Sequence, residues 1–143
     1  NKSAIAHHYD ISNYFYSLVL GPTMVYSCAV FRSANDSLEE AQTEKVDLIC
    51  RKLGLRPGMK LLDIGCGWGT LVMHAAKEYG VTAIGVTLSQ RQVDLAQRRV
   101  DRSGLEKMVD IRLQDYREVR DINFDVSSSV GMSEHVGDKN LEQ

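Results

Sequence analysis

The chain has 143 residues with 43% hydrophobic and 25% charged side chains, which is enough for one domain with a buried core. A net charge of -2, from 17 Lys and Arg against 19 Asp and Glu residues, argues against a dedicated nucleic-acid-binding surface, because such a surface needs an excess of basic residues. The apolar runs fall short of the ~20 residues of a membrane-spanning helix, and Cys28, Cys50 and Cys66 form no C-x-x-C pair, which indicates reduced cytosolic thiols.

Residues 1–36 are predicted to form a helical, aromatic-rich cover segment. A short helix is expected over residues 12–20, with Ser12 as its N-cap and Gly21 at its end. Residues 23–31 are β-prone but do not alternate cleanly, which indicates an ordered loop. The main domain is predicted to occupy residues 37–143.

This domain is expected to open with an amphipathic scaffold helix. Ser37 and Glu40 form a capping-box pattern, and apolar residues follow at roughly helical spacing as far as Leu53. Gly54 closes the helix, and the turn at residues 56–58 leads into the first strand.

The most informative stretch is Leu61 to Leu71, with the sequence LLDIGCGWGTL. An apolar strand enters a turn with three glycines at alternate positions, and a helix to residue 79 leaves it. Such glycines allow positive φ and close approach of a ligand to the main chain, while the first amides of the helix add partial positive charge. The spacing is G-x-G-x-G and not the dinucleotide pattern G-x-G-x-x-G, and Asp63 precedes it, so S-adenosylmethionine is favoured over a pyrophosphate. The alternative is a glycine turn needed for packing alone.

A second strand is predicted over residues 81–86, and Ser89 with Gln92 is predicted to form the capping box of a helix ending near Gly104. Alternating strands and helices indicate parallel pairing, with ligands beyond the carboxyl ends of the strands. Adenosine sites usually have an acid after the second strand to hold the ribose, but this chain offers Thr87, Ser89 and Gln92 instead. For Gln92, helix capping is an equal alternative to ligand contact.

A third strand is expected over residues 109–113 and a fourth over residues 126–130. Asp115 follows the third strand, where it could accept a hydrogen bond from an adenine amino group; the alternative is a surface acid. The fourth strand holds three consecutive serines, which is unusual for a strand buried on both faces. Beyond it, Glu134 and His135 lie where the methyl group of bound S-adenosylmethionine would point, although Glu134 could instead complement a helix dipole.

Five segments together resemble the cyclopropane-fatty-acyl-phospholipid synthase family, which includes the mycolic acid cyclopropane synthases and related fatty-acid methyltransferases. They are His8-Tyr9-Asp10, Met24 to Ala29 (MVYSCA), Leu61 to Gly69 (LLDIGCGWG), Gly85 to Ser89 (GVTLS) and Glu134 to Gly137 (EHVG). The resemblance implies an α/β, Rossmann-like S-adenosylmethionine-dependent methyltransferase fold with a doubly wound parallel sheet. Since the chain lacks an initial methionine and stops in a polar segment, we expect the N-terminal part of a larger enzyme.

The resemblance further implies transfer of the sulfonium methyl group of S-adenosylmethionine to the cis double bond of an unsaturated acyl chain, on a phospholipid or a carrier. Loss of a proton then closes a cyclopropane ring. Bicarbonate would be the base, held in part by Glu134 and Cys28, and no metal is expected. The residues that would contact the co-substrate are Tyr26, Ser27, Asp63, Gly65, Cys66, Gly67, Trp68, Gly69, Thr87, Leu88, Ser89, Gln92, Gln114 and Asp115.

Two other functions stay open. A fatty-acid C-methyltransferase of the same family would leave a methyl-branched or hydroxylated chain, and a non-catalytic S-adenosylmethionine-binding fragment is favoured by the short chain and the serine-rich strand. An NAD oxidoreductase is disfavoured by the loop spacing. A lipid substrate implies a cytoplasmic protein with peripheral contact to the inner membrane surface.

Overall fold

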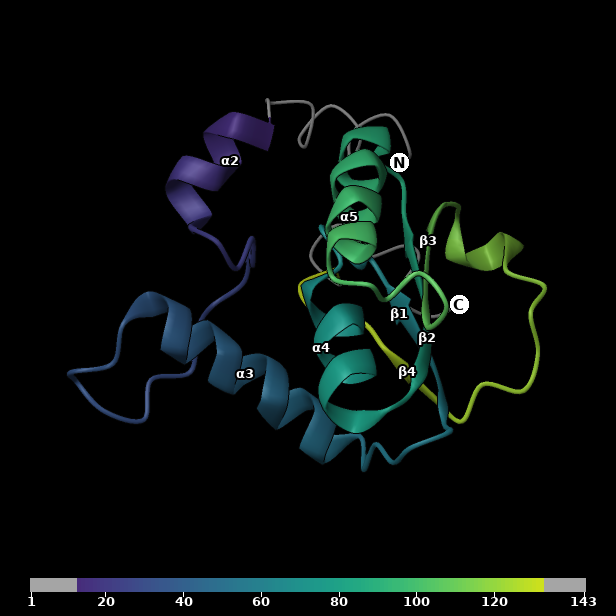
Figure 1. The fold of residues 1–143 in the computed structure, drawn as a ribbon, viewed down its shortest axis with the longest axis horizontal. Helices are drawn as coiled ribbons and strands as arrows, with labels where there is room; N and C mark the ends of the chain where they lie inside the picture. Colours follow the sequence, from purple (N-terminus) through teal and green to yellow (C-terminus); the bar gives the residue numbers. More distant parts are fainter. Residues whose placement is uncertain (1–12, 133–143) are drawn as a thin grey trace, which may run out of the picture.

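The computed structural model describes residues 13–132. They form a parallel four-stranded sheet in the order β3-β2-β1-β4, together with helices (Figure 1). The strands are β1 (Lys60–Ile64), β2 (Thr82–Thr87), β3 (Val109–Leu113) and β4 (Val126–Ser128). The helices are α2 (Asn13–Leu20), α3 (Leu38–Lys52), α4 (Thr70–Tyr79), α5 (Gln90–Arg102) and the short 3-10 helix η1 (Tyr116–Glu118). The α/β fold class predicted from the sequence is confirmed.

The order of the strands reverses at β1. From β1 the chain moves outward to β2 and β3, and then returns to the other side of β1 to form β4. In open parallel sheets, ligands bind in the crevice that such a reversal leaves beyond the carboxyl ends of the strands. Here that crevice lies beyond β1 and β4, where Asp63 and Ser128 are paired across the two strands.

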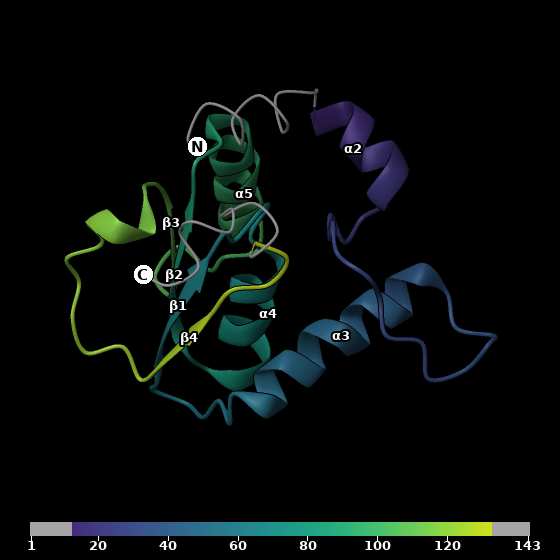
Figure 2. The same cartoon turned by 180° about the vertical axis from the view of Figure 1, so that it is seen from behind.

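The hydrophobic core lies between the sheet and the helices α3, α4 and α5. Leu61, Ala83 and Val109 are paired in register across β1, β2 and β3, and all three belong to this core. The helices contribute the buried residues Val46, Cys50, Val72, Ala75, Ala76, Ala96 and Val100. Seen from behind, the strands lie in front of both α4 and α5, so these two helices cover the same face of the sheet (Figure 2).

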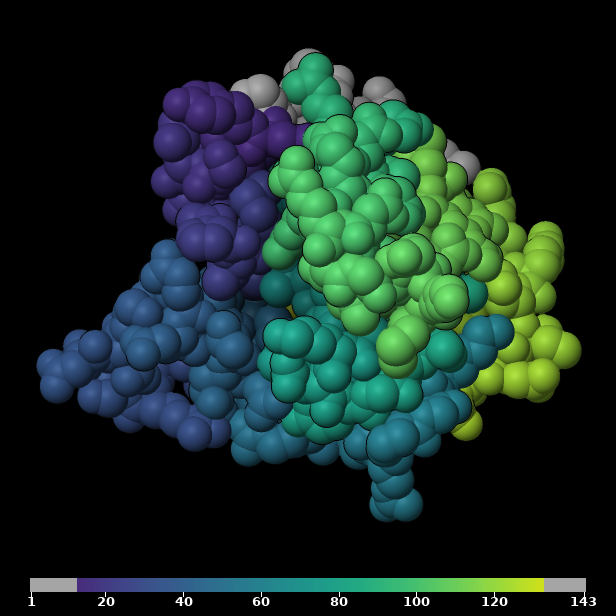
Figure 3. Space-filling view, viewed as in Figure 1, coloured from purple at the N-terminus to yellow at the C-terminus, as the bar shows by residue number. Residues whose placement is uncertain are grey.

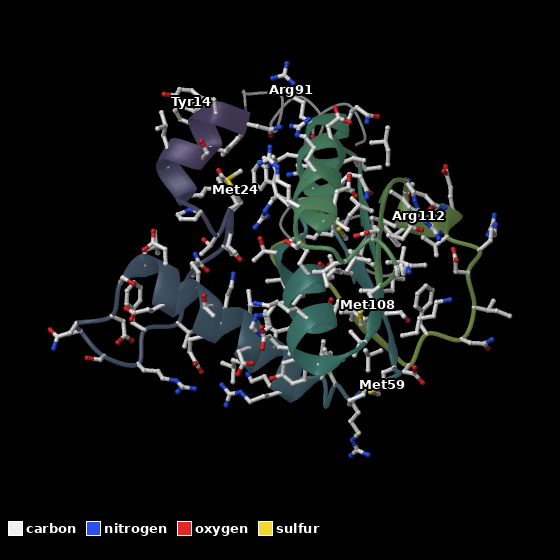
Figure 4. All side chains as sticks on the ribbon, in the orientation of Figure 1. Tyr14, Met24, Met59, Arg91, Met108 and Arg112 are labelled. Carbon is white, nitrogen blue, oxygen red and sulfur yellow. The ribbon has the colours of Figure 1, made fainter. Side chains whose placement is uncertain are left out.

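Trp68 in the glycine loop anchors the N-terminal segment. Its ring is 2% exposed and packs with Tyr16 of α2 and with Met24, in a cluster separate from the main core. Its indole N–H donates to the side-chain oxygen of Asn13 at 2.9 Å. The segment of α2 lies beside α5 and above α3 in the space-filling view (Figure 3), and Met24 lies where the chain leaves α2 (Figure 4).

Arg99 of α5 connects the glycine loop, the start of α4 and the residues that follow α2 through hydrogen bonds. Its guanidinium group donates to the carbonyl oxygens of Trp68 at 2.6 Å and Thr23 at 3.4 Å, and to the hydroxyl of Thr70 at 3.0 Å. The Thr70 hydroxyl in turn donates to the carbonyl of Thr23 at 2.6 Å. The residues that follow α2 are therefore held against the start of α4 by apolar and polar contacts together.

Most predicted boundaries are close to those observed. The capping box of Ser37 and Glu40 is confirmed, while Ser12 lies outside the described residues. The second predicted capping box is only half right: the Ser89 hydroxyl accepts from the backbone of Gln92, but the Gln92 side chain turns to the hydroxyl of Thr87. The fourth strand ends at Ser128 and not at residue 130.

Gly85 provides a test of how tightly the glycine loop sits on β2. A Cβ at this position would lie 2.9 Å from both the Cβ and the Sγ of Cys66 and 3.1 Å from the side chain of Ile111. We expect Gly85→Ala to lower the free energy of unfolding by about 1–3 kcal/mol, because the core must move to admit the methyl group. Urea denaturation of the purified protein measures this change.

The matched control is Thr82→Ala, which changes an exposed side chain at the start of the same strand. Its effect should stay within roughly 0.5 kcal/mol. A Gly85→Ala protein as stable as the control would show that the loop is not packed against β2 as described.

Candidate functional site

A cavity of about 670 Å³ lies at the carboxyl edge of the sheet. Its size falls within the ~300–1,000 Å³ of typical small-molecule sites. Its walls come from the ends of β1 and β2, the glycine loop, the segments after β3 and β4, the segment after α2, and one face of α3. The predicted site residues that line it are Tyr26, Ser27, Cys28, Asp63, Gly65, Cys66, Gly67, Trp68, Thr87, Leu88, Gln92, Gln114 and Asp115.

The three glycines of the loop have positive φ angles but different surroundings. Gly67 has no atom within 4 Å of the position that a Cβ would take, whereas Gly65 faces the side chain of Met132. Gly69 does not line the cavity: it is the N-cap of α4, and a Cβ there would meet Ala96 and Ile111 at 3.4 Å. A role of Gly69 in ligand contact stays a prediction, and its observed role is to close the turn against the core.

Asp63 is a buried carboxyl group at the end of β1, with 3% of its surface exposed. Burial raises its pKa to about 6, and the hydrogen bond that Ser128 of β4 donates at 2.7 Å acts in the opposite direction. This contact gives a physical reason for part of the serine run. Ser128 is buried against Asp63, while Ser127 and Ser129 are exposed, so this strand is not buried on both faces within the described structure.

The wall beyond β2 is polar and uncharged. The hydroxyl of Thr87 donates to the side-chain oxygen of Gln92 at 2.6 Å and accepts from the backbone N–H of Ser89 at 3.3 Å. All three side chains are buried, but Ser89 caps α5 and does not line the cavity. The groups expected to hold a ribose are therefore ordered by bonds among themselves.

Asp115 forms the wall beyond β3 and is 4% exposed, so its interpretation as a surface acid is wrong. Its carboxylate caps η1 and pairs with Arg117, whose Nη2 lies 2.7 Å away. This carboxylate keeps the pKa of the Arg117 guanidinium raised. Gln114 is tied to η1 by a bond from its side-chain nitrogen to the carbonyl of Glu118 at 2.9 Å.

The segment after α2 brings Tyr26, Ser27 and Cys28 to the opposite wall. The ring of Tyr26 meets Tyr16 edge-on at 5.7 Å, and Ser27 accepts a hydrogen bond from Lys45 of α3 at 2.6 Å. Cys28 has an exposed thiol. Glu134, the other predicted catalytic residue, lies outside the described residues.

Lys45, Gln42 and Ser128 are polar residues at or beside the site that the sequence interpretation missed. Gln42 and Lys45 belong to a helix expected to be scaffold, yet both are buried. A signal was available, because they fall on the same helical stripe as Ala41, Val46 and Ile49 and interrupt its apolar character. For Ser128 the signal was the serine run itself.

Two negative findings apply to residues 13–132. They contain no group of three or more His, Cys, Asp or Glu side chains placed to hold a metal ion. Within the same residues, no helix is long and apolar enough to cross a membrane.

The raised pKa of Asp63 predicts a pH-dependent stability. The carboxyl group of Asp63 binds its proton more tightly in the folded protein than in the unfolded chain. Protonation of Asp63 therefore contributes fully to the free energy of unfolding below about pH 4, and this contribution is lost as the pH rises through 6. We expect Asp63→Asn to raise the free energy of unfolding at pH 8 by up to about 3 kcal/mol, at about 1.4 kcal/mol per pKa unit, and to change it little at pH 4. Urea denaturation at both pH values checks this.

Asp94→Asn is the control, since Asp94 is an exposed acid on α5. It should shift the free energy of unfolding by less than roughly 0.5 kcal/mol at either pH. A gain from Asp63→Asn that is equal at pH 4 and pH 8 would contradict the assignment of the proton to Asp63.

Comparison with known proteins places this site in a family. All of residues 1–143 match the family model described as mycolic acid cyclopropane synthetase. The chain is 53% identical over 140 residues to a probable fatty acid methyltransferase of Mycobacterium tuberculosis, covering 98% of this chain and 33% of that protein. It is 51% identical over 135 residues to the cyclopropane-fatty-acyl-phospholipid synthase of Escherichia coli, covering 94% and 34%.

The fold agrees with a solved structure of the same group. A crystal structure of mycolic acid cyclopropane synthase CmaA1, complexed with SAH and CTAB, superimposes with a TM-score of 0.91 at 40% sequence identity. The match covers 97% of this chain and 48% of that one. The chain therefore spans about a third of the two curated relatives and about half of CmaA1. On the match to the family model and the shared fold, this chain belongs to the mycolic acid cyclopropane synthetase family.

Proposed function

We propose that this chain forms the co-substrate-binding part of an enzyme that transfers a methyl group from S-adenosylmethionine to the cis double bond of an unsaturated fatty-acyl chain and closes a cyclopropane ring. The observation that carries the proposal is the cavity at the strand-order reversal, bordered by the glycine loop and the buried Asp63. Membership of the family supports the reaction class.

The residues present fit S-adenosylmethionine. Gly67 leaves open space for close approach of a ligand to the main chain, and the buried carboxyl of Asp63 is suited to a positively charged amino-acid group. Thr87 and Gln92 would face the ribose without adding charge, and Asp115 would lie at the adenine end. The G-x-G-x-G spacing makes a dinucleotide less suitable.

The methyl-transfer end of the cavity, which would receive the acyl chain, is proposed to lie toward Tyr26 and Cys28. Bound S-adenosylmethionine would supply an electrophilic sulfonium methyl group. An alkene that accepts this group becomes a carbocation, which the aromatic face of Tyr26 at the cavity wall can stabilise. Cys28 would help to hold bicarbonate as the base that removes a proton, and Glu134, two residues after Met132 of the cavity lining, would be the second group that holds it.

A fatty-acid C-methyltransferase is the second candidate, because the chain is 53% identical to a relative described as a probable fatty acid methyltransferase. Both candidates share the co-substrate and the methyl transfer. They differ in the fate of the carbocation, which loses a proton from the new methyl group in one case and gives a branched or hydroxylated chain in the other. Acyl phospholipid and carrier-bound chain are both suitable substrates.

Peripheral contact with a membrane belongs to the same proposal, for a protein in the cytoplasm. The helix α2 has no charged residue, and it exposes the apolar side chains of Tyr14, Phe15, Leu18 and Val19. Clustered exposed apolar side chains often mark an interaction site. In this proposal α2 contacts the bilayer from which the acyl chain is taken.

The reaction is tested with the full-length protein, S-adenosylmethionine carrying a deuterated methyl group, and vesicles of a cis-monounsaturated phospholipid. Mass spectrometry after chromatography should find a cyclopropane lipid that retains two of the three deuterium atoms. Glu134→Gln should reduce this product by roughly 100-fold or more, as expected when the base that removes the proton is no longer held in place.

The products separate the candidates. A branched or hydroxylated lipid would replace the cyclopropane proposal by the methyltransferase. Binding of S-adenosylhomocysteine without any labelled lipid, from phospholipid or from carrier-bound substrate, would leave a non-catalytic binding protein and exclude both enzymes.

Membrane contact is tested by vesicle flotation. We expect Leu18→Glu to lower the vesicle-bound fraction by at least about fivefold, because a charge replaces a side chain whose burial contributes roughly 1.5–3 kcal/mol. Ile122→Glu adds the same charge at another exposed apolar side chain, far from α2 in the sequence, and should leave binding unchanged. Equal effects of the two variants, or a wild-type protein that does not float with vesicles, would reject α2 as the contact.

A further inference from the structure

Lys45 is a buried cation in the wall of the cavity. Its side chain belongs to α3, the residue is 8% exposed, and it lines the cavity beside Ser27 and Cys28. Within residues 13–132 the ammonium group has one hydrogen-bond partner, the hydroxyl of Ser27 at 2.6 Å, and no carboxylate lies within ion-pair distance of it. An ammonium group has three N–H donors. Two of its three donors are therefore left for another partner.

Packing alone does not account for a lysine at this position. Buried charges in proteins are normally paired, and an unpaired one is costly. Burial lowers the pKa of Lys45, and the neighbouring Cys28 acts in the opposite direction. Lys45 lies on the same face of α3 as Val46 and Ile49, so an apolar residue in place of Lys45 would pack there without this cost. The lysine is thus better explained by something it binds.

The neighbouring contacts fix where the ammonium group points. Gln42, almost one turn earlier on α3, donates from its side-chain nitrogen to the carbonyl oxygen of Ser27 at 2.8 Å. Gln42 therefore holds the backbone of Ser27, and Lys45 contacts its hydroxyl. Because Lys45 and Ser27 both line the cavity, the ammonium and hydroxyl groups meet at one part of its wall.

The other charges around the cavity leave Lys45 as the group suited to an anion. Arg117 also lines the cavity, but Asp115 pairs with its guanidinium group. Asp63 is acidic and accepts from Ser128. Among the described lining residues, a cation without an acidic partner is found only at Lys45.

We propose that Lys45 and Ser27 form an anion subsite of this cavity, which binds a carboxylate-type oxyanion. Two sources share this chemistry: the α-carboxylate of S-adenosylmethionine and free bicarbonate. The subsite rests on the proposed function, because it assumes that this cavity receives the co-substrate. If the anion is the α-carboxylate, the acid at Asp63 and the cation at Lys45 provide opposite charges for the zwitterionic end of one ligand.

The test compares two ligands on the full-length protein by calorimetry: S-adenosylhomocysteine, and the analogue that lacks only the carboxylate. Lys45→Met should weaken binding of S-adenosylhomocysteine by roughly 10- to 100-fold, as expected for loss of a charged hydrogen bond, and change binding of the analogue by less than about twofold. Ser27→Ala, which keeps the ammonium group, should show the same selectivity with a smaller loss. Lys52→Met, at an exposed lysine of the same helix, is the control and should alter neither affinity.

A second arm identifies bicarbonate as the anion. In that case Lys45→Met leaves both affinities unchanged but raises, by about tenfold or more, the bicarbonate concentration that gives half-maximal labelled product. Equal weakening of both ligands, or no change in any of these measurements, would overturn the subsite and leave Lys45 with a structural role. A wild-type protein that binds neither ligand would overturn the proposed function, and the subsite with it. Thermal unfolding of each variant confirms that it folds.

Discussion

The burial of an acidic side chain where the strand order reverses is the constraint on which the site depends. Asp63 is the last but one residue of β1 and is 3% exposed, and the described structure gives its carboxyl one side-chain partner, Ser128. That partner is available because β4 returns to pair with β1 in a register that places residue 128 beside residue 63. The sheet topology therefore decides both where a ligand can bind and how the acid beside it is held.

The cavity also depends on contacts made far from the sheet. Its N-terminal wall, residues 24–28, is held by Trp68 and by the α3 residues Gln42 and Lys45, and Arg99 holds the preceding Thr23. Trp68 has two functions at once, since it lines the cavity and also anchors α2 through Asn13. A change in the glycine loop would therefore be expected to displace this wall as well as the ligand-binding backbone.

The sequence predicted the parts of the fold that follow from local patterns. The strands, the glycine turn and the Ser37 cap depend on residues close together in the chain, and the structure has each of them. The pairing of Ser128 with Asp63 joins residues far apart in the chain, so no local pattern contained it. The Gln92 side chain accepts from Thr87, which is close in the chain, but the capping pattern alone does not decide between this partner and a backbone N–H. Asp115 is a different case, because its ion pair with Arg117 joins residues two positions apart and was still not predicted.

The state of Asp63 links folding to binding. With a pKa near 6 instead of 3.8, its ionised form opposes folding by about 3 kcal/mol at neutral pH. A positively charged ligand group beside it would offset part of that cost, so part of the affinity comes from relief of an unfavourable state already present in the free protein. Lys45 has the complementary situation, as a buried cation that lacks an acidic partner in the described residues. If the anion at Lys45 is the carboxylate of the co-substrate, one ligand offsets both charges and a neutral nucleoside offsets neither, so the two buried charges would then favour an amino-acid-bearing nucleoside over simpler ones.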